Sequence, residues 1–204
     1  MQTLQSLQYL KGLPGADKNQ LKKKQVTFPP YKPQQHKKTV IFDLDETLVH
    51  CIDDINSKSY QVPISVTFPN GETVKAGINI RPFALECLRK VSEKFQVVVF
   101  TASHQSYADE VLDKLDPKRE LIAKRLYRDH CLQTAEGIYI KDLRIIKNRT
   151  LKEVVIVDNA VYSFGYQLDN GIPIIPYYDN PKDEELLHLI HYLDCLENSK
   201  DMRE

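Results

Sequence analysis

The sequence predicts an α/β fold built on a doubly wound, mostly parallel sheet. Three short runs of apolar and β-branched residues, at 39–42, 95–100 and 154–157, have the length and composition of buried strands. Apolar residues recur at helical spacing in 83–91 and again in 107–115. Because strands that alternate with helices along a chain assemble into parallel sheets, these observations favour the α/β class.

The remaining elements of the domain follow weaker signals. Residues 121–126 and 172–175 predict two further strands, and 137–143 is a short β-like run that carries a lysine. Pro82 fits the first position of the helix that covers 83–91, and Pro181 fits the first position of the last helix.

Residues 51–80 separate the first strand from the first helix and predict a small antiparallel β-flap. Within this insert Ile64 and Val66 alternate with polar residues, and an Asn-Gly pair at 70–71 lies between two extended runs. Such a pair is a strong signal for a hairpin turn. Ile64 and Val66 therefore share one face of a flap strand.

The rest of the chain divides into three parts. Residues 1–38 are polar and lysine-rich with a cluster of prolines, so we expect a flexible arm that adds little to the core. The domain covers 39–198, and 199–204 form a C-terminal tail.

Composition limits the partners and the compartment. Lys+Arg and Asp+Glu both number 28, so the net charge of 0 predicts no direct nucleic-acid partner. No apolar run approaches the roughly 18 residues of a membrane span, and the N-terminus lacks a signal-peptide pattern. The scattered cysteines predict reduced thiols in an intracellular protein. They are Cys51, Cys87, Cys131 and Cys195.

Polar groups follow the predicted strands where a parallel sheet places its site. Asp43 and Asp45 follow the first strand and leave an extended chain on the same side. Thr101 follows the second strand, and an Asp-Asn pair at 158–159 follows the third. Strand ends of this kind lie along one edge of the sheet, so the sequence predicts a Mg²⁺ site suited to phosphate chemistry.

The string from Asp43 to His50 (DLDETLVH) resembles the signature of the small RNA polymerase II C-terminal-domain phosphatases, in the haloacid dehalogenase superfamily. The likeness continues through Arg-Pro at 81–82, Thr-Ala-Ser at 101–103, Lys-Asp-Leu at 141–143 and Asp-Asn at 158–159. It implies a Rossmann-like core and an aspartate nucleophile.

The resemblance and the chemistry assign the same catalytic roles. Asp43 would attack phosphorus and become an aspartyl-phosphate. Asp45 would protonate the leaving alkoxide, and neighbouring carboxylates should raise its pKa above the usual value of about 3.9. Thr101 would offer its hydroxyl to the phosphate and Lys141 would neutralise developing charge. We therefore expect activity that is best at mildly acidic pH.

The resemblance also implies a ligand set and a substrate path. Mg²⁺ would be held by Asp43, the Asp45 carbonyl and Asn159, with Asp158 close by. Substrate-binding positions of the family match five residues of this chain. They are Ala102, Tyr107, Arg128, Ile64 and Val66. For the two flap residues, plain packing is an equal alternative.

The sequence thus predicts a Mg²⁺-dependent phosphatase of phosphoserine in a protein tail or loop, such as the RNA polymerase II C-terminal domain. The small insert leaves the site open to a macromolecule. We expect a monomer in the nucleus or the cytoplasm. Two alternatives remain: a non-catalytic peptide-binding protein on the same fold, and a phosphatase of small molecules or lipids.

Overall fold

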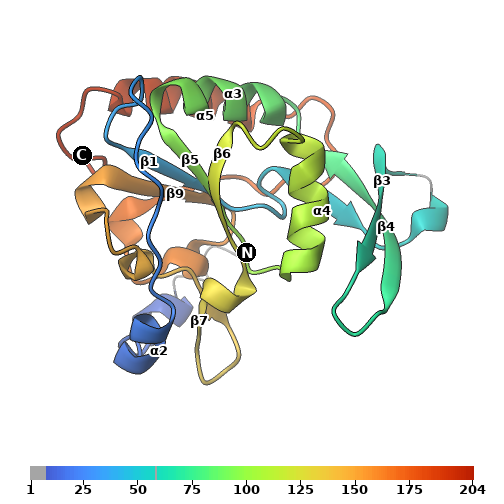
Figure 1. The fold of residues 1–204 in the computed structure, drawn as a ribbon, viewed down its shortest axis with the longest axis horizontal. Coiled ribbons are helices and arrows are strands. Elements are labelled where there is room, and N and C mark those ends of the chain that lie inside the picture. Colours follow the sequence, from blue (N-terminus) through green and yellow to red (C-terminus); the bar gives the residue numbers. More distant parts are fainter. Residues whose placement is uncertain (1–7, 58) are drawn as a thin grey trace.

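A five-stranded parallel sheet forms the centre of the computed structural model, which describes residues 8–57 and 59–204 (Figure 1). Its order is β10-β9-β1-β5-β6, and each neighbouring pair runs parallel. The strands are β1 (Thr39–Phe42), β5 (Gln96–Phe100), β6 (Ile122–Leu126), β9 (Val154–Asp158) and β10 (Gly171–Pro173). The predicted parallel α/β sheet is confirmed.

The order of the strands creates a crevice beside β1. The chain lays β5 and then β6 on one side of β1, and β9 and then β10 on the other. Where the direction of winding reverses, the connections leave β1 and β9 on opposite faces, which opens a crevice at the carboxyl ends of these strands. All four residues of β1 are buried, as expected for a central strand covered on both faces.

Three α-helices cover one face of the sheet. They are α3 (Ala84–Lys94), α4 (Gln105–Leu115) and α5 (Glu185–Leu196). Val40, Val97 and Val155 point from the sheet into this larger core cluster. Figure 1 shows α3 and α5 side by side, with α4 between β6 and the flap.

Short elements cover the opposite face, where Ile41, Val98 and Ile156 point. Long helices are replaced there by α2, by 3₁₀ turns and by a two-stranded hairpin. These elements are α2 (Lys18–Lys23), η3 (Leu143–Ile145), η5 (Val161–Phe164), β7 (Leu132–Gln133) and β8 (Tyr139–Ile140). Further 3₁₀ turns are η1 (Ile55–Ser57), η2 (Arg128–His130), η4 (Leu151–Glu153) and η6 (Leu168–Asn170).

The segment before β1 contributes to the core, in contrast to the expectation for residues 1–38. Phe28 is 2% exposed and packs in the cluster of the second face. Val26 donates its N–H to the carbonyl of Ile145, and Phe28 donates its N–H to the side chain of Asn148. A single buried aromatic residue among prolines has no periodicity, so the pattern could not predict this docking. Residues 1–7 lie outside the described part of the chain.

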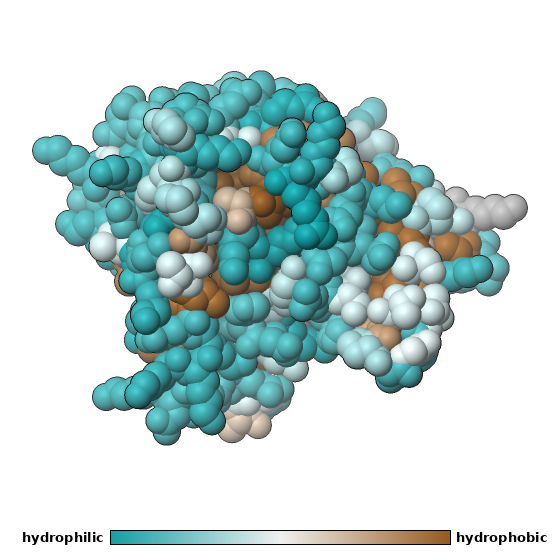
Figure 2. All heavy atoms as spheres, viewed as in Figure 1, coloured by the Kyte–Doolittle hydropathy of each residue, from teal (hydrophilic) through white to brown (hydrophobic). Residues whose placement is uncertain are grey.

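The insert forms the predicted antiparallel flap, with a third strand added. Its sheet has the order β2-β4-β3, from β2 (Val49–Ile52), β3 (Val62–Thr67) and β4 (Thr73–Ile80). Gly71 adopts a φ of +85° in the turn between β3 and β4. On the face shown in Figure 2, hydrophobic atoms gather over the flap at the right of the view.

Two helices begin later than their prolines suggested. Helix α3 starts at Ala84, because Phe83 adopts a left-handed φ of +64° and ends the preceding turn. Helix α5 starts at Glu185 rather than at Pro181. The N–H of Glu185 donates to the carboxylate of Asp183. Both prolines therefore lie in turns that precede the helices.

The C-terminal residues dock on the domain. Met202 is buried in the larger core cluster and donates its N–H to the carbonyl of Lys152. Among the residues described, none of the helices has both the length and the apolar character to cross a bilayer.

Candidate active site

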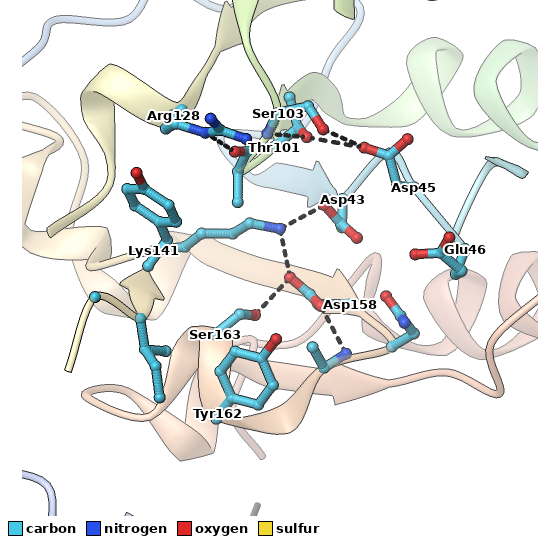
Figure 3. Close-up of a pocket in the computed structure, with 16 residues that line it drawn as sticks. Asp43, Asp45, Glu46, Thr101, Ser103, Arg128, Lys141, Asp158, Tyr162 and Ser163 are labelled. Carbon is cyan, nitrogen blue, oxygen red and sulfur yellow. Dashed lines mark hydrogen bonds and ion pairs between the residues drawn. The ribbon is translucent and has the colours of Figure 1, made fainter. Parts of the chain in front are cut away.

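The carboxyl ends of β1, β5 and β9 surround a cavity of about 630 Å³ (Figure 3). Asp43 follows β1, Thr101 follows β5 and Asp158 ends β9. Lys141 arrives from the end of β8. All four predicted residues line the cavity. These four side chains therefore meet at the carboxyl edge of the sheet.

Lys141 bridges two buried carboxylates. Its Nζ lies 2.5 Å from Asp43 Oδ1 and 2.6 Å from Asp158 Oδ2. The Lys141 residue is 2% exposed, so this cation and its partners are almost wholly removed from water. The second oxygen of Asp43, Oδ2, accepts a hydrogen bond of 3.3 Å from the Thr47 hydroxyl.

Burial and charge together shift the pKa values of this group. Burial, followed by the charge of Asp158, raises the pKa of Asp43 to about 8, although Lys141 opposes the shift. Burial lowers the pKa of Lys141, but the attraction of Asp158 and Asp43 outweighs it and the pKa is raised overall. Lys141 is thus a permanent cation, and the Asp43 carboxylate carries its charge at a cost that a further cation would offset.

Three hydroxyl groups orient the Asp45 carboxylate. Ser103 Oγ donates to Oδ2 at 2.6 Å, Thr101 Oγ1 donates to the same oxygen at 3.4 Å, and Tyr107 donates to Oδ1 at 2.7 Å. Burial, followed by the charge of Asp45, raises the pKa of Tyr107. The phenol therefore remains a donor, and the side chain of Asp45 is held toward the end of β5.

The side-chain amide of Asn159 faces two oxygen atoms. It lies 3.2 Å from Asp43 Oδ2 and 3.3 Å from the backbone carbonyl of Asp45. If the Asn159 amide nitrogen points toward these atoms, it donates a hydrogen bond to each of them. If the amide oxygen points toward them instead, three oxygens lie close together: those of Asn159, Asp43 and the Asp45 carbonyl. A set of carboxylate, carbonyl and amide oxygens fits Mg²⁺. No cluster of three His, Cys, Asp or Glu side chains forms a metal site in the described chain, so any site here depends on the carbonyl and the amide.

Asp158 lies at the end of β9 and accepts hydrogen bonds from three groups around the cavity. Its Oδ2 accepts from the Ser163 hydroxyl at 2.5 Å as well as from Lys141, and its Oδ1 accepts from the N–H of Ala160 at 2.8 Å. Since Asp158 is 1% exposed, it acts on the cavity mainly by fixing the ammonium group of Lys141.

The expected substrate-binding residues divide into two groups. Ala102 and Arg128 line the cavity, and Arg128 Nε donates to the Ala102 carbonyl at 2.7 Å. Tyr107 contacts Asp45 from outside the lining. Ile64 and Val66, by contrast, are 4% and 3% exposed and pack in the core on the α4 side of the flap. The burial of these two side chains fits the packing alternative.

Several residues at the site had no role predicted from the sequence. Ser103 and Ser163 hold the two carboxylates Asp45 and Asp158, while Glu46 and Tyr162 line the cavity. Ser103 belonged to the Thr-Ala-Ser string, whose position after β5 was the available signal. Ser163 and Tyr162 depend on the 3₁₀ turn η5, which carries no periodic signal.

Arg81 braces the loop that carries the carboxylates. Its guanidinium pairs with Asp183 at 2.7 and 2.9 Å and donates to the carbonyls of Thr47 at 3.2 Å and Ile175 at 2.8 Å. It also lies 5.6 Å from the centre of the Tyr177 ring. One buried cation therefore joins the loop after β1, the loop after β10 and the turn before α5.

A carboxylate at the end of the central parallel strand, a buried lysine and a second carboxylate at the end of the neighbouring strand β9 are typical of phosphatases of the haloacid dehalogenase class. A family model described as NLI interacting factor-like phosphatase matches residues 38–203. The chain belongs to this family, which confirms the resemblance noted from the motifs.

Similar proteins carry related names. The chain is 42% identical over 181 residues to CTD small phosphatase-like protein 2 of Dictyostelium discoideum, covering 87% of this chain and 30% of that protein. It is 37% identical over 177 residues to CTD nuclear envelope phosphatase 1 of Xenopus tropicalis, covering 83% of this chain and 71% of that protein. Three of the curated relatives are matched over only 30%, 57% and 53% of their length.

The fold is also that of a solved structure of Fcp1, described as an essential RNA polymerase II CTD phosphatase. The TM-score is 0.59 at 23% identity, and the match covers 81% of this chain and 52% of that one. At this identity the likeness establishes the fold.

Proposed function

We propose that this protein is a Mg²⁺-dependent phosphatase that removes phosphate from phosphoserine in a protein tail or loop, through an aspartyl-phosphate on Asp43. One observation carries the proposal. The two oxygens of the Asp43 carboxylate have different surroundings: Oδ1 lies 2.5 Å from Lys141 Nζ, and Oδ2 faces the Asn159 amide at 3.2 Å. Asp43 Oδ1 can therefore attack phosphorus while Oδ2 stays beside the Asn159 amide and the Asp45 carbonyl.

In the first step Asp43 Oδ1 attacks the phosphorus of phosphoserine, and the bond from phosphorus to the serine oxygen breaks. Asp45 donates a proton to the departing serine oxygen. Lys141 neutralises charge on the phosphoryl oxygens, and Thr101 offers its hydroxyl to them. The products are the substrate with an unmodified serine side chain and the Asp43 aspartyl-phosphate.

In the second step Asp45 accepts a proton from water, whose oxygen attacks phosphorus. The bond from phosphorus to Asp43 breaks, and phosphate leaves. Asp43 and the protonated Asp45 are restored, so the cycle is balanced. Because Ser103 and Tyr107 both donate to Asp45, a small rotation of this carboxylate exchanges those contacts for the serine oxygen or the water.

Asp43 Oδ2, the Asp45 carbonyl and the Asn159 amide oxygen would hold the Mg²⁺ ion. When bound, the ion would neutralise charge that develops on the transferred phosphate. A cation at Oδ2 would also favour the ionised form of Asp43 that attack needs.

The shape of the cavity favours a macromolecular substrate. Residues of the flap do not contribute to the cavity lining, since the flap packs on α4 instead. A phosphorylated side chain on an extended segment can enter such an open site. The names of the relatives, which include CTD small phosphatases and a nuclear envelope phosphatase, support a phosphoprotein substrate such as the RNA polymerase II C-terminal domain and an intracellular, nuclear or cytoplasmic place.

The proposal is tested by phosphate release from an aryl phosphate and from phosphoserine peptides near pH 5.5, with Mg²⁺ or with EDTA. We expect turnover that requires Mg²⁺, is abolished by Asp43→Asn and is strongly reduced by Asn159→Ala. The Mg²⁺ concentration at half-maximal rate should rise at least about tenfold in Asn159→Ala, by analogy with the loss of one metal contact. If folded wild-type protein with Mg²⁺ released no phosphate, the non-catalytic peptide-binding alternative would replace the proposal.

A further inference from the structure

A second groove, of about 570 Å³, continues from the active-site cavity toward β10. The two share four lining residues, namely Glu46, Asn159, Ala160 and Tyr162. The far wall of the groove is formed by residues 173–176 and by Tyr178. Any extended chain that leaves the cavity on this side must therefore cross the groove.

The walls of the groove are apolar and exposed. Ile175 is 62% exposed, Tyr178 47% and Tyr162 37%, which places them among the large hydrophobic residues left open to solvent. These three side chains surround the same groove. Exposed apolar groups gathered in a concavity beside a reactive site are typical of a surface that contacts a ligand.

Glu46 supplies the only charged side chain of the groove lining among the described residues. Its backbone has a φ of +56° and is fixed by two bonds: its N–H donates to the Val49 carbonyl at 2.7 Å, and its carbonyl accepts from the N–H of Tyr177 at 2.8 Å. His50 Nδ1 lies 3.2 Å from Glu46 Oε1, and the His50 ring packs edge-on against Tyr178 at 5.2 Å. The carboxylate is thus held at the junction of cavity and groove.

Side chains of opposite charge flank Asp43 on its two sides. Figure 3 shows Arg128 and Glu46 on opposite sides of Asp43. A peptide whose phosphoserine lies at Asp43 and Lys141 meets a guanidinium on one flank and a carboxylate on the other. The Glu46 flank favours a positive side chain, and the apolar walls beyond it favour a hydrophobic one.

We propose, on the basis of the proposed phosphatase function, that this groove is a specificity subsite for a substrate segment that carries a Lys or Arg and then an apolar residue on one side of the phosphoserine. The basic side chain pairs with Glu46. The apolar side chain packs against Ile175, Tyr162 and Tyr178. Phosphoserine segments without a basic residue are poorer substrates for this reason.

The test uses matched phosphoserine peptides that differ only in their flank: Lys-Leu, Ala-Leu, Lys-Ser or Ala-Ser, placed before or after the phosphoserine. With wild-type protein we expect kcat/KM for Lys-Leu to exceed that for Ala-Leu by about threefold to fivefold in one of the two directions, as for a partly exposed ion pair. The step from Lys-Ser to Lys-Leu should give a factor of about five, as for partial burial of an apolar side chain.

Paired variants assign each preference to its wall. Glu46→Gln should abolish the Lys-over-Ala ratio and retain the Leu-over-Ser ratio, while Ile175→Ser should do the reverse. Ratios between peptides cancel any general effect of a variant on catalysis. Glu72→Gln in the flap turn and Leu85→Ser on α3, which is 42% exposed, remove the same groups elsewhere and should leave both ratios unchanged.

Binding of the same peptides to Asp43→Asn, followed by fluorescence anisotropy, reads the subsite without turnover. The same order of affinities would support the inference. Equal kcat/KM and equal affinity across the panel would overturn the subsite inference. Continued release of phosphate from an aryl phosphate would at the same time uphold the phosphatase function. Loss of all turnover with the binding order intact would instead overturn the phosphatase function alone.

Discussion

Asp43 is a buried carboxylate whose ionisation opposes folding. Its pKa is raised from 3.8 to about 8 in the folded protein by burial, then by Asp158. Between these values the folded state holds a proton that the unfolded state has released. The contribution of Asp43 to the free energy of unfolding therefore falls as pH rises from about 4 to about 8.

We accordingly expect the Tm of wild-type protein in EDTA to fall across that pH range, and the Tm of Asp43→Asn to fall less. At pH 8 the inactive variant should be the more stable protein, because an amide replaces a buried charge. Thermal unfolding of both proteins at several pH values checks this. Parallel curves for the two proteins would contradict the assigned direction. Mg²⁺ should raise the Tm of wild type and reduce the difference.

Tyr107 donates to Asp45 at 2.7 Å and has no direct place in the cavity lining. Removing its hydroxyl in Tyr107→Phe should lower kcat by about tenfold, equivalent to the loss of one hydrogen bond to a charged group, with a smaller change in KM. Tyr127→Phe is the matched control, because that phenol donates to Asp109 in the middle of α4 and not to Asp45. Equal kcat values for the two variants would show that Tyr107 does not position Asp45.

At the scale of elements, Arg81 joins three loops around the site through a buried ion pair with Asp183. Arg81→Met would leave the Asp183 carboxylate buried without its partner, and we expect a loss of about 3–5 kcal/mol in the free energy of unfolding. Urea denaturation measures it. The double variant Arg81→Met, Asp183→Asn should recover part of that loss, because no lone charge remains. A double variant less stable than either single one would argue against the ion pair as the cause.

The strands of the sheet were predictable because each consists of consecutive apolar residues between polar boundaries. The groups at their ends followed from the geometry of a parallel sheet. Elements without a period were not predictable: Phe28 is one aromatic residue in a polar arm, and η5 places Ser163 and Tyr162 by a single 3₁₀ turn. The same limit affected helix α3, whose start depends on the left-handed φ of Phe83 rather than on Pro82.

The flap exposes a different limit of sequence patterns. Alternation in β3 correctly placed Ile64 and Val66 on one face. It could not say whether that face meets a ligand or another helix, because both environments select apolar side chains. Both side chains are buried in the larger core cluster and β3 contacts α4, which favours packing.

At the scale of the whole molecule, the four cysteines report on global unfolding. All are free thiols, and burial raises the pKa of Cys87 and of Cys131 to about 12 each, and that of Cys51 to about 11. The thiolate is the reactive form, so these three should resist alkylation in the folded protein. Cys195 on α5 is exposed and should react first.

Labelling with iodoacetamide at pH 8, followed by mass spectrometry, should thus give one modified site in native protein and four in denaturant. Cys195→Ser is the control and should leave native protein nearly unlabelled. Rapid labelling of Cys87 or Cys131 in native buffer would mean that α3 or the turn before β7 opens without global unfolding.

The short edge strand β10 also governs how these molecules meet one another. Ile174, the residue after it, donates its N–H inward to the Asp158 carbonyl of β9 at 3.2 Å. Because successive N–H groups of an extended chain point to alternate sides, the nitrogen of Pro173 faces outward, where proline has no hydrogen to donate. The exposed margin of the sheet is consequently a poor template for strand addition, and the protein is guarded against edge-to-edge aggregation at that margin.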